Sequence, residues 1–429
     1  MEPTTTINDA IWTGWQKNAF RFFFLFLSIT SIAGYNVIVG IFSLYESYWG
    51  KTISFLSSPV YWLDRHFYHF GYDPKQHSAY FADGYFGWAS LVTIFFFSIA
   101  GTILWAILDK KRSNYNKLHF WFRTYLAYYL FLALNLYAFE KMIPSQMPYP
   151  NVDELLSPVG NQSRFRIVWN FIGSNTAYSI FTGVCELIAA LLILFRRTRV
   201  FGCLFMTTVL INVVCLNFFY NIPVKISCSQ LLLTTLFLLA PYVPRLWQFF
   251  YKLKPVSLAE KAYRFTTPWK NVLLFLLLLG PAWASFGSIK HSLFMNKRDI
   301  ESRKNQKLYQ VNVFVKNTDT IPPLLNDTLR WKRFALTAYR KDKEAIIYNM
   351  HDEGDYYNYD IDSIKKTITL HDNPDTNTWH IFHYNNPGPG LYELTGTWKK
   401  FPIHVEMKAL NIDSMFYLTR EKITWVQDY

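Results

Sequence analysis

Two apolar stretches in the middle of the chain contain the polar residues best suited to chemistry. The first, Tyr178 to Phe195, has a single ionisable residue, Glu186, and the second, Phe201 to Tyr220, has Asn212 and Asn217. At about 1.5 Å per helical residue, Glu186 and Asn212 would lie at similar depths in two membrane helices. We therefore expect one polar layer, with Glu186 facing the bundle interior within hydrogen-bond reach of Asn212 or another polar side chain.

This polar layer has a functional and a structural interpretation. A charged residue at the centre of a membrane helix costs roughly 2.5 to 3.5 kcal/mol, which makes it a candidate functional residue. Glu186, Asn212, Asn217 and Lys225 supply hydrogen-bonding groups and, in Glu186, a proton source, so they could bind the polar head group of a ligand. Glu and Asn side chains also hold helices together through interhelical hydrogen bonds. The sequence leaves both interpretations open.

Two further candidates, Tyr137 and Glu140, lie three residues apart near the end of another apolar stretch. This spacing places them on one face of a helix, near the expected outer surface of the membrane. They could belong to the ligand-binding site, or they could form an interfacial aromatic and charged belt together with Lys141.

The elements that must position these residues follow from composition. Of 429 residues, 51% are hydrophobic and only 17% are charged, while the last third of the chain is polar. This pattern predicts a transmembrane helical domain at 1–290 and an extracytoplasmic all-β domain at 291–429. The net charge is +13, but the first domain holds 24 Lys and Arg against 12 Asp and Glu, and the second holds 19 against 18. The basic excess belongs to the membrane domain, so we expect the lipid bilayer and not nucleic acid as partner.

Apolar segments of about 20 residues predict seven membrane spans. They are Phe20 to Phe42, Gly84 to Ile107, Phe120 to Phe139, Ala177 to Phe195, Phe201 to Tyr220, Val224 to Leu246 and Asn271 to Ile289. The loops on one side carry 16 Lys and Arg and those on the other side carry 8. By the positive-inside rule the N-terminus is cytoplasmic. An odd number of spans then places the C-terminal domain in the periplasm, outside a bacterial inner membrane.

Beyond residue 300 the apolar residues alternate with polar ones, in stretches such as YQVNVFVKN, TWHIFHY and FPIHVEMKA. This period of two predicts about eight or nine short strands, arranged as a sandwich or a small barrel. The chain has no zinc-binding spacing, and only His119 lies even at the edge of a span, so neither metal nor haem is expected. No nucleophile motif or phosphate loop stands out, and whether any reaction is catalysed stays open.

The helices that carry the polar layer also carry a family resemblance. The stretches YSIFTGVCELIAALLILFRRTRVFG and NVVCLNFFYNIPVK resemble the DoxX-like membrane proteins of bacteria. The matching residues are Tyr178, Gly183, Glu186, the FRRT run, Gly202, Asn212, Leu216, Asn217, Tyr220, Pro223, Val224 and Lys225. FEKMIPSQMP is similar to the segment after the first core helix of these proteins. DTLRW (Asp327 to Trp331), the alternating strands and the closing FYLTREKITWVQDY resemble the exported β domain of their long forms.

The resemblance implies a four-helix membrane core, partners in respiration or oxidative stress, and a quinone head group at the polar layer. The first functional expectation is therefore a redox-associated accessory or quinone-interacting subunit with a membrane or periplasmic protein partner. Two alternatives remain. One is a non-catalytic scaffold whose exported β domain binds a periplasmic partner or lipid, and the other is a membrane-embedded maturation enzyme of the vitamin K carboxylase type.

Overall fold

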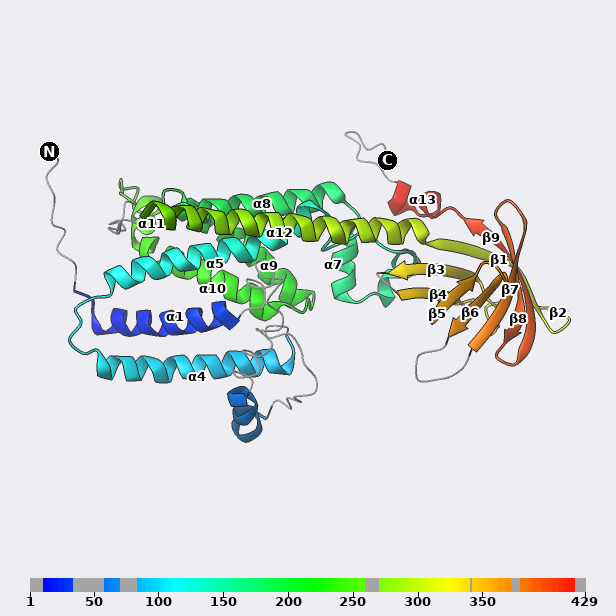
Figure 1. Cartoon of the computed structure of the whole chain (residues 1–429), viewed down its shortest axis with the longest axis horizontal. Coiled ribbons are helices and arrows are strands. Elements are labelled where there is room, and N and C mark those ends of the chain that lie inside the picture. The colour runs from blue at the N-terminus through cyan, green and yellow to red at the C-terminus, as the bar shows by residue number, and fades with distance from the viewer. Residues whose placement is uncertain are drawn as a thin grey trace. The chain divides into compact units, whose positions relative to one another are not determined.

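The computed structural model describes residues 11–33, 58–69, 83–258, 270–339, 342–371 and 379–420 (Figure 1). The chain forms two compact units. The first consists of Met1–Ile143 and Ile180–His291, and the second consists of Pro144–Ser179 and Ser292–Tyr429. The segment Pro144–Ser179, which the sequence patterns left with the membrane domain, thus belongs to the unit that contains the strands.

Helices form the first unit, and two of them, α8 and α12, continue into the second. The described helices and helical turns of this part are α1 (Gly14–Ala33), η1 (Asp64–Tyr68), α4 (Tyr85–Leu108), α5 (Asn116–Met142), α8 (Thr176–Leu194), α9 (Arg199–Phe219), α10 (Lys225–Leu239), η3 (Ala240–Tyr242), α11 (Val243–Phe250) and α12 (Lys270–Asn305).

Four helical stretches are long and apolar enough to cross a membrane: Tyr85–Leu108, Thr176–Leu194, Arg199–Phe219 and Lys225–Phe250. The expected count of seven is not reached among the described residues. Part of the expected first span, 34–42, lies outside them. The expected third span falls on α5, which carries charged residues near both ends and is not among the four.

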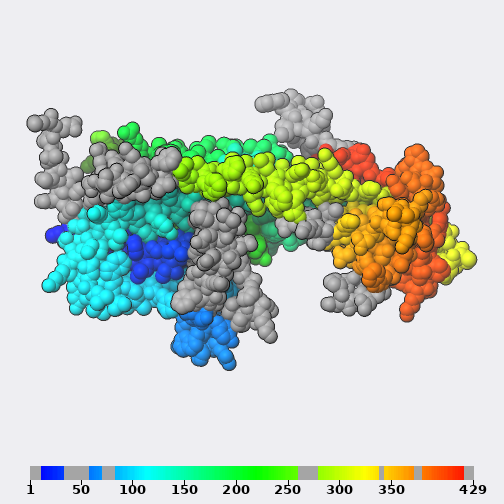
Figure 2. Space-filling model, in the orientation of Figure 1, coloured from blue at the N-terminus to red at the C-terminus, as the bar shows by residue number. Residues whose placement is uncertain are grey.

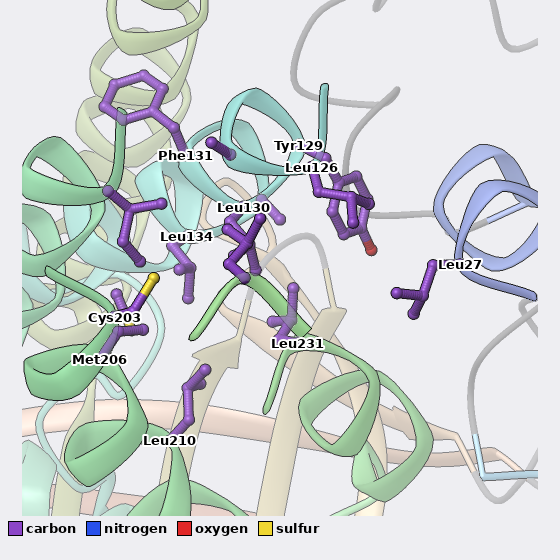
Figure 3. Close-up of a cluster of buried hydrophobic side chains, with 14 of the residues drawn as sticks. Leu27, Leu126, Tyr129, Leu130, Phe131, Leu134, Cys203, Met206, Leu210 and Leu231 are labelled. Carbon is purple, nitrogen blue, oxygen red and sulfur yellow. The ribbon is translucent and has the colours of Figure 1, made fainter. Parts of the chain in front are cut away.

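The core of the first unit explains how α5 can be less apolar than its neighbours. Figure 3 shows Leu126, Leu130 and Leu134 along α5, spaced four residues apart so that they form one apolar stripe. The same buried cluster contains Leu27 of α1, Cys203, Met206 and Leu210 of α9, and Leu231 of α10. Because most of α5 is buried or half-buried, polar side chains such as Asn135 and Lys141 can meet neighbouring helices.

A tight turn joins α8 to α9 and makes them neighbours. At Gly202 an added Cβ atom would lie 2.6 Å from the backbone nitrogen of Ile193, so only glycine allows this approach. Thr198 Oγ1 donates to the Leu192 carbonyl at 2.8 Å, and Arg199 Nε donates to the Ile193 carbonyl at 3.1 Å. The cationic run after Glu186 therefore ends one helix and starts the next, as the sequence predicts.

An antiparallel β-barrel forms most of the second unit. Its strands are β1 (Lys307–Lys316), β2 (Asp319–Thr320), β3 (Arg333–Tyr339), β4 (Asp342–Tyr348), β5 (Gly354–Asp362), β6 (Thr367–His371), β7 (Trp379–Gly388), β8 (Leu391–Trp398) and β9 (Phe401–Leu410). They pair in the order β2-β1-β3-β4-β5-β6-β7-β8-β9, and β1 also pairs with β9. This last pairing closes β1 and β3 to β9 into an eight-stranded barrel (Figure 1). Of the two expected architectures, the small barrel is confirmed. Among the described strands, closure leaves no long sheet edge unpaired.

Side chains alternate between the inside and the outside of the barrel along each strand. On β1, Tyr309 and Val311 belong to the interior cluster, but so does Phe314, three residues after Val311. The change of parity arises from a bulge, because the register with β9 shifts after Val311 and leaves Asn312 as the extra residue. Nη2 of the buried Arg330 donates to the Asn312 carbonyl at 3.3 Å and so supports this bulge.

The second unit also contains short helices. They are α6 (Val152–Leu156), η2 (Val159–Asn161), α7 (Arg164–Gly173), α13 (Ile412–Met415) and α14 (Tyr417–Arg420). Of these, α6 and α13 pack against the outside of the barrel. Val152 is fully buried against the outer face of β1, β3 and β4, in one cluster with Leu308, Ala335 and Ile346. Its backbone nitrogen donates to Gln306 Oε1 at 3.2 Å. In Figure 2 the strands, yellow to orange, form one closely packed body.

Candidate functional site

Glu186 of α8 faces the interior of the first unit and forms an ion pair with Lys141 of α5. Only 4% of Glu186 is exposed, and its Oε1 accepts a hydrogen bond from Lys141 Nζ. The second oxygen, Oε2, is buried and has no hydrogen-bond partner among the described residues. One turn away the helices touch, since a Cβ atom at Gly183 would lie 2.6 Å from the Ala138 carbonyl oxygen. The expectation that Glu186 faces inward and meets a polar side chain is confirmed, with Lys141 as its partner.

Further polar contacts join α5 to α12. Glu140 Oε1 lies 3.7 Å from His291 Nε2, and the half-buried Tyr137 lies one turn before Glu140. Asn135 is fully buried, and its amide donates to Ser288 Oγ at 3.0 Å while its oxygen accepts from Ser285 Oγ at 2.9 Å. Polar residues of α5 therefore join this helix to α12, through Asn135 and Glu140, and to α8, through Lys141.

The two asparagines of α9 lie elsewhere. Asn212 is exposed, and no described contact joins it to Glu186. Asn217 is buried, and its amide donates to the Val213 carbonyl of its own helix at 2.7 Å. Equal depth in the membrane does not determine whether the side chains of two helices face each other. Asn212 lies on the side of α9 that points away from the protein core.

Lys225 has a structural environment at the start of α10. The Asp83 carboxylate accepts from the backbone nitrogens of Lys225 at 2.9 Å and Ile226 at 3.1 Å, and from Lys225 Nζ at 3.2 Å. Asp83 thereby satisfies backbone donors at a helix N-terminus, where a negative charge is favourable. Lys225 Nζ also donates to Asn221 Oδ1 at 3.0 Å.

The expected quinone-site residues are therefore distributed over separate places. Glu186 is with Lys141, Lys225 is with Asp83, Asn217 bonds to its own helix, and Asn212 is exposed. Sequence reasoning missed Lys141 as the partner of Glu186. A signal was present, because a buried carboxylate in an apolar helix requires a cation, and Lys141 is a cation near the same expected membrane surface. Nothing in the sequence indicated that Asn135 would be buried and would bind α12.

The second unit contains a ligand-sized cavity inside the barrel, at the end where β1 begins and β9 ends. Its volume is about 260 Å³. Its apolar lining comes from Phe334, Leu336, Ile361, Ile368, Leu394 and Met407. Its polar lining comes from Lys307, Tyr309, Ser363, Tyr384 and Tyr392. Ligand pockets usually measure roughly 300 to 1,000 Å³, so this cavity suits a small ligand or one end of a longer one.

The polar groups of this cavity are a cation and hydroxyls. Tyr309 is 5% exposed, and its ring packs edge-on against Tyr392 with the centroids 4.9 Å apart. The Tyr309 hydroxyl is protonated at neutral pH, as an ordinary tyrosine is, and burial raises its pKa further. No side-chain hydrogen bond is formed by the hydroxyls of Tyr309, Tyr384 or Tyr392 within the described part of the chain. These hydroxyls can therefore bond to a ligand.

Aromatic rings fill the opposite end of the barrel. Trp331 is fully buried, and its ring centroid lies 5.2 Å from Trp398, 5.8 Å from Phe382 and 6.0 Å from Phe314. A barrel of eight strands has an interior just wide enough to be filled by side chains or to hold one small ligand. In this barrel side chains fill the end around Trp331, and the other end contains the cavity.

The comparisons with known proteins give one relative. The chain is 30% identical over 112 residues to a Bacillus subtilis (strain 168) protein named "Uncharacterized protein YwoB". The match covers 26% of this chain and 71% of that protein. No protein-family model matches the chain, and no solved structure matches it.

Proposed function

We propose that this chain, which belongs to the family of the Bacillus subtilis protein YwoB, is a membrane protein whose β-barrel binds a small, largely apolar ligand. The observation that supports this most is the cavity of about 260 Å³ inside the barrel. A barrel formed only as a structural domain would be expected to fill both ends with side chains, as this one does around Trp331. The function is then that of a scaffold that presents a lipid-binding domain.

A larger side chain at the rim of the cavity should prevent the ligand from binding. Ile361 lines the cavity and is 42% exposed, so Ile361→Trp adds volume there with little disturbance of the deeper core. Ile364 lies in the next turn, is 95% exposed and does not line the cavity, which makes Ile364→Trp a matched control.

The experiment is extraction and mass spectrometry of small molecules from the full chain purified out of native membranes. Wild type and Ile364→Trp should carry the same lipid-like molecule, and Ile361→Trp should lose most of it. An equal amount of bound molecule in both variants would contradict binding in the barrel.

The proposal includes a location and a topology. We place the chain in a bacterial inner membrane with seven spans, a cytoplasmic N-terminus and the barrel in the periplasm. The expected cytoplasmic loops carry 16 Lys and Arg and the loops on the other side carry 8, which supports this orientation. The four apolar helices support a multi-pass membrane protein. A periplasmic barrel could receive its ligand from, or pass it to, a membrane or periplasmic protein partner.

A second candidate function, the quinone-interacting subunit suggested by the DoxX-like resemblance, is favoured by one observation. Oε2 of Glu186 is buried beside Lys141 and has no partner among the described residues. A quinol hydroxyl could donate to this oxygen, and the carboxylate could receive its proton. Under this alternative, quinone should copurify with wild type and with Ile361→Trp but not with Glu186→Gln. Loss of the same molecule from Ile361→Trp alone would favour the barrel.

A further inference from the structure

We infer that the cavity takes the apolar part of an anionic amphiphile such as a fatty carboxylate, with the head group beside Lys307. The inference rests on the proposed function and adds the chemical class and the orientation of the ligand. It is carried by two features of the cavity, the kinds of polar groups that line it and the order in which they occur from rim to interior.

The lining favours an anion over a cation. Among the described residues it contains one ammonium group, on Lys307, and four hydroxyls, on Tyr309, Ser363, Tyr384 and Tyr392, but no Asp or Glu. Lys307 forms no ion pair with any residue that the structure describes. Charge-assisted hydrogen bonds from ammonium to carboxylate are stronger than neutral ones, whereas a cationic ligand would find no counter-charge here.

The order of these groups fixes the orientation of the ligand. Lys307 is exposed and is the first residue of β1, at the rim. Tyr309 is two residues further along the same strand, on the same face and almost fully buried. Phe334 pairs directly with Tyr309 and is 2% exposed, and Leu394, two residues further along β8 than Tyr392, is 4% exposed. The polarity thus falls from a charge at the rim, through hydroxyls, to hydrocarbon, which matches a head group outside and a tail inside.

Tyr309 adds a neutral donor below the head group. A tyrosine hydroxyl is protonated at neutral pH, so this buried group presents a hydrogen-bond donor and no negative charge to an anion. Tyr384 and Tyr392 present the same kind of group from β7 and β8.

The test compares two probes of equal chain length, isotope-labelled dodecanoate and dodecanol, binding to the full chain in lipid nanodiscs. Binding to Ile361→Trp gives the background from partition into lipid. Wild type should bind dodecanoate about five- to tenfold more tightly than dodecanol. Lys307→Gln should remove this preference and leave dodecanol binding unchanged. Lys307→Arg keeps the positive charge and should keep the preference for dodecanoate.

The matched control is Lys408→Gln, on β9. Lys408 is exposed and adjacent to the lining residue Met407, so it lies on the outer face of the barrel at nearly the same height. This variant loses the same charge and should keep the preference for dodecanoate. Equal affinity of wild type for both probes, or equal effects of the two lysine variants, would overturn the inference while leaving ligand binding intact. Binding of neither probe above background would overturn the proposed function as well.

Discussion

The pair Lys141 and Glu186 has both charges largely removed from water, with side chains 12% and 5% exposed. Removing two charges from water is costly, and their attraction offsets this cost only while both are present. The approach of α5 and α8 at Gly183 holds the two side chains together one turn away. The pair is therefore more sensitive to the loss of one partner than to the loss of both.

Replacing Lys141 with methionine tests this property. Lys141→Met should lower the free energy of unfolding by about 3 to 5 kcal/mol, because it removes the cation from a buried carboxylate. The double variant Lys141→Met with Glu186→Leu should recover much of that loss. Calorimetric unfolding of the full chain in detergent measures both.

The control for this pair is Lys290→Met, an exposed position on α12. It should change stability by less than about 0.5 kcal/mol. Equal stability of Lys141→Met and Lys290→Met would show that the ion pair makes no contribution.

In the second unit, half-buried Asp153 in α6 should make stability depend on pH. Burial raises its pKa in the folded state, while Arg166 and backbone donors lower it in part. A carboxyl whose folded pKa is raised favours folding below its unfolded pKa. This contribution is lost as pH rises from the unfolded pKa through the folded pKa, because the folded state must then hold a buried charge.

Asp153→Asn removes the charge and should raise the melting temperature of the second unit at pH 7 while leaving it almost unchanged at pH 4. Asp319→Asn, at an exposed position of β2, serves as the control and should have no effect at either pH. Calorimetry of the full chain at pH 7 and pH 4 measures the melting temperatures of both variants and of wild type. A gain that is the same at both pH values would exclude the carboxyl as its cause.

At the scale of elements, one close helix contact involves Gly183 of α8. A Cβ atom there would lie 2.6 Å from the Ala138 carbonyl oxygen and 2.9 Å from the Met142 backbone nitrogen of α5. Backbone atoms cannot move aside as a side chain can, so any larger residue would force the two helices apart.

Gly183→Ala should therefore destabilise the chain by about 1 to 3 kcal/mol, in spite of the higher helix propensity of alanine. Gly280→Ala is the matched control, since no atom lies within 4 Å of a Cβ at that helical position. It should stabilise the chain by up to about 1 kcal/mol. Opposite shifts in melting temperature are expected, and two shifts of the same sign would contradict the close approach.

Local patterns in the sequence predict the elements well, because they depend on neighbouring residues. The alternation in TWHIFHY predicts β7, and Phe382 within it is buried in the barrel. The bulge after Val311 could not be predicted, since it depends on pairing with β9, which is distant in sequence. Nor does the alternation show that Tyr309 and Tyr392 would line one cavity, because strand order and closure decide which strands meet.

The candidate site shows the same limit. Hydropathy identified Glu186 as a buried charge, and the structure places it inside. Its partner depends on how α5 and α8 are rotated about their axes, which sequence spacing within one helix does not determine. The expected association with Asn212 relied on depth alone, and depth does not specify which face of α9 is turned inward.

At the scale of the whole molecule, the proposed topology can be tested with cysteine labelling. The four natural cysteines, Cys185, Cys203, Cys215 and Cys228, lie in α8, α9 and α10, so the barrel is free of them. Lys365, in the turn between β5 and β6, has a side chain that is 78% exposed. Lys110, between α4 and α5, is exposed in the loop expected to be cytoplasmic.

A membrane-impermeant maleimide added to intact cells with a permeable outer membrane should label Lys365→Cys. It should label Lys110→Cys only after the inner membrane is lysed. The reverse pattern would place the barrel in the cytoplasm and contradict the orientation derived from the cation distribution.

We propose that the ligand occupies the barrel and not the helical bundle. The most direct measurement is photocrosslinking of the full chain in nanodiscs with a dodecanoate that carries a diazirine near its tail, followed by peptide mass spectrometry. We expect the modification on peptides that contain Phe334, Leu394 or Met407, which line the inner part of the cavity, and we expect Ile361→Trp to suppress it. Modification confined to α5, α8 and α9, unchanged by Ile361→Trp, would contradict the claim.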